Sequence, residues 1–180
     1  MPKFPILDLE GPSDVKLTLE QRYSTLLTVY KLQYFAIFRH IGERFGWEAA
    51  NDIADDMAAE GIPFIAKGYQ RKFDLPGEGA ALVAQVLTSE FQVEGGDVEV
   101  IVENEAEAEY KVLCSFGDAL QSGKFDDVDI TDGLCTRGCW GWTQAMADTV
   151  KPGLHVERLT WMGNGAPRCH FKIAPAVAAE

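Results

Sequence analysis

The chain has 180 residues, of which 47% are hydrophobic and 24% are charged, and this composition is typical of a globular domain rather than a disordered protein. Its formal net charge is −12, a sign that repels phosphate backbones and argues against a nucleic-acid partner. No apolar run approaches the ~20 residues that span a bilayer, and the first residues lack the apolar segment of a signal peptide. We therefore expect a cytoplasmic protein with no membrane partner.

The N-terminal half is predicted to be mainly helical. Residues 1–17 contain three prolines and no periodicity, so they are interpreted as an arm. Thr18 to Gln21 has the form of a capping box, and apolar residues then recur three and four apart to about Gly46, which predicts one long helix. Three further helices are predicted, with Gly61 ending the first of them, over 47–59, 65–73 and 78–91.

The second half changes to a period of two residues. Apolar and charged residues alternate over 98–103 and 108–112, which predicts a hairpin with one solvated face and with Cys114 in phase with the buried face. An acidic loop and a helix over about 133–149, capped by Asp132, should follow. A second hairpin is predicted from 154–162 and 168–173. Residues 18–175 are therefore expected to form a single α+β domain, with helices packed on a four-stranded antiparallel sheet.

All the cysteines follow residue 113. They are Cys114, Cys135, Cys139 and Cys169. Without an export signal they are interpreted as structural thiols, metal ligands or a nucleophile rather than as a disulfide scaffold.

A metal site would use Cys135, Cys139 and Cys169, whose thiolates suit zinc or iron. The spacing of the first two is Cys-x3-Cys instead of the commoner Cys-x2-Cys. His170 follows Cys169 directly, and neighbouring residues of a strand point to opposite faces. The sequence therefore predicts no cofactor, with zinc or iron as the alternative.

A catalytic thiol would be Cys139 or Cys114, supported by Cys135. The general acid or base would come from His155, Glu157 or His170, which all lie on the final hairpin. The residues expected to bind the ligand are Trp140, Trp142, Trp161 and Arg137.

Several short segments carry a family resemblance. They are Val112–Cys114, Cys135 with Cys139, Pro152–Leu154, Glu157–Thr160 and Met162–Phe171, of which Gly163–Phe171 is the most specific part. Together they resemble the L-2-amino-thiazoline-4-carboxylate hydrolases and, more distantly, are similar to 4-vinyl reductase small-molecule-binding domains.

The resemblance implies an α+β ligand-binding domain that, in the hydrolase branch, opens a cyclic C–N bond. In the sensor branch it implies a zinc held by cysteines and a glutamate, with Glu157 and Cys169 on such positions and Cys135 or Cys139 as a further ligand. Thr160 stands where another cysteine would be expected.

The function predicted from these observations is that of a small-molecule enzyme. It would act on a cyclic or carboxylate-bearing substrate by hydrolysis or by a related lyase or isomerase step. The alternative is a non-catalytic, sensor-type domain that binds a small molecule or a metal. A homodimer formed through the aromatic helix 18–45 is a further expectation.

Overall fold

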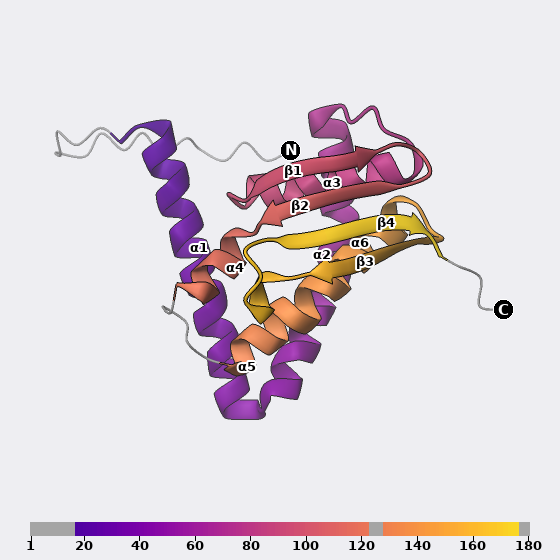
Figure 1. Ribbon diagram of the computed structural model, residues 1–180. Coiled ribbons are helices and arrows are strands. Elements are labelled where there is room, and N and C mark those ends of the chain that lie inside the picture. The colour runs from indigo at the N-terminus through magenta and orange to yellow at the C-terminus, as the bar shows by residue number, and fades with distance from the viewer. Residues whose placement is uncertain (1–16, 123–127, 177–180) are drawn as a thin grey trace.

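A four-stranded antiparallel sheet with helices on one face forms the described part of the chain. The computed structural model describes residues 17–122 and 128–176, so almost all of the predicted arm lies outside it. Strands follow the order β1-β2-β4-β3, and α2, α3 and α6 lie behind the sheet in Figure 1. The predicted α+β architecture is confirmed.

The elements have the following bounds in chain order: α1 Leu19–Phe45, α2 Trp47–Phe73, α3 Gly79–Val93, β1 Asp97–Glu103, β2 Ala108–Leu113, α4 Ser115–Gln121, α5 Val128–Ile130, the π-helix η1 Thr131–Gly138, α6 Cys139–Val150, β3 Leu154–Thr160, the 3-10 helix η2 Met162–Asn164 and β4 Cys169–Pro175. No helix among the described residues is both long enough and apolar enough to cross a membrane.

The capping box predicted at the start of α1 is present. The Thr18 hydroxyl accepts a hydrogen bond from the Gln21 backbone N–H at 3.1 Å, and the Gln21 side chain accepts one from the Thr18 N–H at 2.8 Å. α1 extends beside the sheet rather than beneath it (Figure 1). Leu19 and Phe45 are therefore exposed, while Phe35 is buried. The homodimer stays a prediction, with these exposed apolar side chains as its expected surface.

α2 is one helix where the sequence predicts two. The expected break at Gly61 is wrong, and Pro63 also lies within the helix. Ile62 and Ala66 are 1% and 0% exposed and belong to the main core. Their burial explains the continuity, because tertiary packing overrides the weak helix propensity of single residues.

The helix predicted to start near residue 133 begins earlier and in a different form. Residues 131–138 form a π-helix, so Asp132 lies inside it and does not cap α6. A Cβ on Gly133 would lie 2.7 Å from Phe38 Cζ and 2.5 Å from Asn51 Oδ1, so this turn packs tightly against α1 and α2. The predicted acidic loop is partly the helix α4, and its residues 123–127 lie outside the described chain.

The core lies between the sheet and the helices behind it. Tyr110 of β2 and Phe171 of β4 are fully buried and stack with ring centroids 5.3 Å apart. Phe91 of α3 stacks on Phe171 at 6.0 Å. As predicted, Cys114 and Cys169 are buried with this inner face.

Candidate ligand-binding site

A cleft of about 260 Å³ opens beside β3, at the edge of the sheet. Its lining residues are Trp140, His155, Val156, Glu157, Arg158 and Trp161. The structure thus brings together four residues that the sequence predicts as site residues, from α6, β3 and the segment after β3, and adds Val156 and Arg158.

One wall of the cleft is Trp140, held against the edge strand by hydrogen bonding. Its indole N–H donates to the Val156 carbonyl at 3.2 Å. Next to it, the Gln144 amide donates to the Leu154 carbonyl at 3.0 Å and accepts from the Val156 N–H at 2.8 Å. These side chains from α6 satisfy backbone groups that an edge strand otherwise leaves open. Trp140 is nevertheless 44% exposed, so its ring surface remains accessible.

Trp161 also lines the cleft, with Arg158 stacked upon it. The guanidinium carbon lies 4.6 Å from the indole centroid, within the range of a cation–π contact. Arg158 also donates to the carbonyls of Cys135 at 2.6 Å and Thr136 at 2.8 Å, so it ties β3 to the π-helix. Fixed in this way, Arg158 gives the acidic protein a local positive charge beside an aromatic surface.

Arg158, like Val156, lines the cleft without belonging to the predicted site. It lies two residues after the buried Val156 and therefore shares the inward side of β3. An arginine in phase with buried residues of a strand is a signal of a special contact, because charged side chains are seldom buried without partners.

Two predicted ligand-binding residues lie away from the cleft. Arg137 forms ion pairs with Asp52 at 3.3 Å and Asp55 at 3.2 Å, both on α2. Trp142 is half-buried and packs against the main core. Neither lines the cleft.

The four cysteines are free thiols, of which Cys114, Cys135 and Cys169 are buried and Cys139 is partly buried. Burial raises the pKa of Cys114 to about 12. Burial also raises the pKa values of Cys135, Cys139 and Cys169, although the nearby charge of Arg158 opposes the shift in each of these three. A nucleophilic cysteine needs the opposite shift, since the thiolate is the reactive form. These thiols are protonated at neutral pH.

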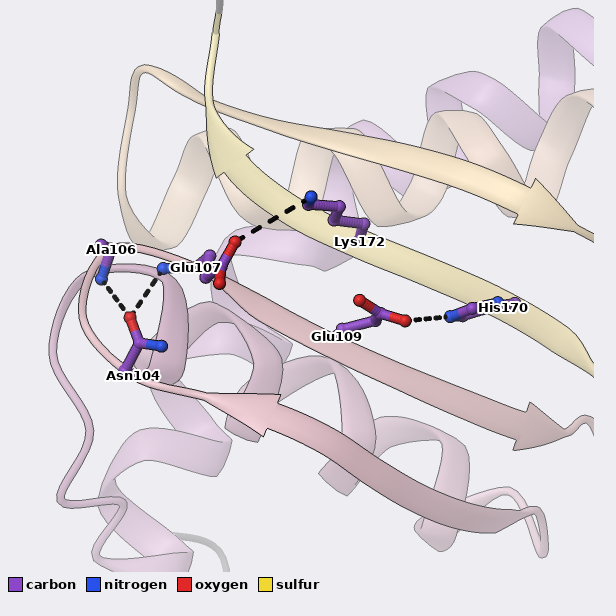
Figure 2. A network of polar contacts seen from close by, with 6 residues as sticks. All are labelled: Asn104, Ala106, Glu107, Glu109, His170 and Lys172. Atoms are coloured by element: carbon purple, nitrogen blue, oxygen red, sulfur yellow. Dashed lines mark hydrogen bonds and ion pairs between the residues drawn. The ribbon is translucent and has the colours of Figure 1, made fainter.

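The predicted general bases lie on the other side of the sheet from the thiols. His170 Nε2 is 2.7 Å from Glu109 Oε1, and Figure 2 shows the pair bridging β2 and β4 on the face opposite the helices. Cys169, the preceding residue, points inward and is 2% exposed. His155 and Glu157 are exposed residues of β3 that alternate with its buried ones. None of these candidate bases is therefore placed beside a thiol.

The described residues contain no group of three or more histidine, cysteine, aspartate or glutamate side chains arranged to hold a metal ion. The predicted set of Cys135, Cys139 and Cys169 is accordingly not gathered as ligands. Glu157, which the sensor branch would use, lies on the exposed side of β3, while Cys169 lies on the buried side of β4.

Comparison with known proteins identifies a fold relative. No protein-family model matches the chain, and no curated protein matches it significantly. The structure is similar to the phenol-responsive sensory domain of the transcription activator PoxR, solved with phenol. The TM-score is 0.52 at 15% identity, over 81% of this chain and 74% of that one. At this identity the likeness shows the fold, and the resemblance to thiazoline-carboxylate hydrolases stays a prediction.

Proposed function

We propose that this chain is a small-molecule-binding domain of the sensory type, which takes a single-ring aromatic ligand in the cleft beside β3. The observation that carries the proposal is that two indoles line one cleft, Trp140 held by its hydrogen bond to Val156 and Trp161 by the Arg158 guanidinium stacked upon it. Binding sites for small molecules are commonly aromatic with a few fixed polar groups. Here Arg158, Glu157 and His155 supply those groups.

The size of the cleft sets the size of the ligand. Drug-sized ligands occupy pockets of roughly 300–1,000 Å³, whereas a cavity of about 150 Å³ already accommodates benzene. The cleft of about 260 Å³ lies between these values. It suits one aromatic ring with a polar substituent. The fold relative, a phenol-responsive sensory domain solved with phenol, supports a ligand of this class.

Binding is favoured over hydrolysis because of where the thiols and bases lie. A cysteine hydrolase requires a thiolate next to a base. In this chain burial keeps Cys114 and Cys139 protonated, and His170 is bonded to Glu109 on the opposite face of the sheet. Hydrolysis of a thiazoline carboxylate stays a prediction that no contact in the described residues supports.

The test is calorimetric titration of the wild-type protein with phenol and with benzoate, and with cyclohexanol as the non-aromatic control. We expect one of the aromatic compounds to bind, and the variants Trp161→Ala and Trp140→Leu to weaken that binding about 10-fold or more, which corresponds to ~1.4 kcal/mol. Trp142→Phe, a change outside the cleft, should bind as the wild type does.

Two results would contradict the proposal. The first is an absence of aromatic binding at millimolar concentration, and the second is unchanged affinity in both cleft variants while their circular dichroism remains native. Incubation with 2-amino-thiazoline-4-carboxylate addresses the rival function separately. Product formation that is lost in Cys139→Ser would favour a hydrolase.

A further inference from the structure

A second polar cluster lies where α1, α2 and α3 meet, on elements different from those that build the cleft. Its centre is Glu90 of α3, which is only 8% exposed. The Tyr69 hydroxyl of α2 hydrogen-bonds with the Glu90 carboxyl. One of its oxygens, Glu90 Oε2, is buried and has no hydrogen-bond partner within the described chain. Buried polar atoms are nearly always hydrogen-bonded, so an open carboxylate oxygen indicates a missing donor.

A second carboxyl lies one helical turn further on. Glu94 follows Glu90 by four residues, the spacing at which like charges on a helix repel. Burial, reinforced by the charge of Glu90, raises the pKa of Glu94 to about 8, while Lys31 of α1 opposes this shift. Each carboxyl would therefore be stabilised in its ionised form by a bound cation.

Three tyrosines lie close enough to these carboxyls for the carboxylate charges to act on their phenols. Tyr30 and Tyr34 of α1 each pack edge-on against Phe116 of α4, with centroids 6.0 and 5.8 Å away. Burial and the neighbouring carboxyls raise the pKa of Tyr30 to about 12, so its ring stays a neutral phenol. Tyr69 of α2 adds a third phenol beside Glu90. Tyr30 is 47% exposed, which leaves a route from solvent along α1.

We propose that this tyrosine–glutamate site, formed by Tyr30, Tyr34, Tyr69, Glu90 and Glu94, binds a protonated primary amine that carries an aryl or alkyl group. An ammonium group has only donors, three of them, and so matches the unpartnered Glu90 oxygen and its neighbour Glu94. Tyrosine faces attract cations within about 6 Å of the ring centroid.

The aromatic walls select an organic cation over a hydrated metal ion. A calcium site needs six to eight oxygen ligands and magnesium keeps a near-octahedral shell. The described residues around Glu90 offer two carboxyls among phenol rings, and no group of three potential metal ligands is present in the described ranges. The same carboxyls disfavour anions.

The first experiment compares ligands of one shape and different charge on the wild-type full chain. Phenethylammonium should bind with a measurable heat, whereas the neutral 2-phenylethanol and the anion 3-phenylpropanoate should bind at least 10-fold more weakly. Equal affinity for the ammonium and the alcohol would overturn the proposal, because it would show that only the aryl group is recognised.

A pH series tests the carboxyls without altering the protein. Glu94 faces Lys31, Tyr30 and Tyr34 of α1, Tyr69 of α2, Glu90 of its own helix and Cys114 before α4. Between about pH 6 and pH 8.5 Glu94 ionises, while a primary alkylammonium stays charged. Affinity for phenethylammonium should therefore rise several-fold across this range. A flat or falling profile would overturn the proposal.

Matched variants separate charge from structure. Glu90→Gln should weaken phenethylammonium binding at least 10-fold, and Glu60→Gln, an equal change at an exposed position on α2, should leave it unchanged. Lys31→Met removes the cation that favours ionised Glu94, so the rise of affinity with pH should move to higher pH in this variant, a change that a merely structural role would not produce. Wild-type affinity in a folded Glu90→Gln variant overturns the proposal. If that variant does not fold, the pH series decides.

Discussion

The two faces of the sheet carry different chemistry although they alternate residue by residue along the same strands. On the inner face, Tyr110 and Phe171 stack without exposure, next to the buried thiol of Cys169. On the outer face, Glu109 and His170 form a half-buried polar pair (Figure 2). A cysteine and a histidine that are adjacent in sequence are thus separated by the sheet. Sequence proximity of reactive residues is weak support for catalysis when the residues lie on a strand.

The largest effect that tests this difference should come from Phe171→Ala. The substitution removes a fully buried ring that stacks on Tyr110 and Phe91, and we expect it to lower the free energy of unfolding by about 3–5 kcal/mol. Lys172→Ala, one residue further and on the outer face, should change it by no more than ~0.5 kcal/mol. Chemical denaturation measures both. Similar losses for the two variants would contradict the assignment of an inner and an outer face.

A smaller loss is expected from Gly163→Ala, beside the inner face. A Cβ there would lie 2.7 Å from Cys135 Sγ and 3.0 Å from its Cβ, and such overpacking typically costs about 1–3 kcal/mol. Gly141→Ala is the control, since a Cβ at that position in α6 meets nothing within 4 Å. The control should be neutral or stabilising because alanine favours helix.

The contact between the Cys135 sulfur and the new methyl group can be tested by combining two substitutions. Cys135→Ala removes the sulfur that the new methyl group would meet, so the double variant with Gly163→Ala should lose less than the sum of the single losses. Thermal and denaturant unfolding of the four proteins give the coupling. Strict additivity would show that the methyl group is accommodated elsewhere.

Tyr110→Phe should stabilise the protein by about 1 kcal/mol, because the Tyr110 hydroxyl is buried without a hydrogen-bond partner in the described chain and an unsatisfied polar group carries a desolvation cost of ~1–3 kcal/mol. Tyr69→Phe offers the contrast, since its hydroxyl bonds with Glu90, and it should destabilise. Loss of stability in Tyr110→Phe, measured by denaturation, would indicate that this hydroxyl is bonded after all.

The sequence correctly predicts the features that follow from the local alternation of apolar and polar residues. Alternation identified both hairpins, placed Cys169 and Phe171 on one buried face, and separated His170 from them. The sequence-based prediction is wrong where contacts between residues distant in sequence determine the structure. The continuity of α2 through Gly61 reflects burial of Ile62, and nothing near that position in the sequence records this packing.

The residues of the candidate site likewise include some that the sequence predicts and some that it does not. Trp140 and Trp161 could be predicted as binding residues from the sequence because large aromatic side chains commonly line binding sites. Arg158 was not chosen because its role rests on the carbonyls of Cys135 and Thr136, more than 20 positions away. Those carbonyls belong to a π-helix, whereas the sequence-based prediction places a helix over about 133–149 and no π-helix before it.

The smallest expected change in stability comes from the outer face of the sheet, and it tests whether that face is exposed to solvent. Glu109→Gln keeps an acceptor for His170 but removes the charge, and because the two side chains are 26% and 18% exposed, the change should cost no more than about 1 kcal/mol. The cost should shrink at high salt, which screens exposed pairs. Glu107→Gln is the matched control, as its contact with Lys172 is longer at 3.9 Å and more exposed. Denaturation at low and high salt compares the two variants.

A cost above about 2 kcal/mol that is insensitive to salt is the behaviour of a buried pair. It would mean that the outer face is covered in solution, so that both faces of the sheet, and not only the inner one, are packed.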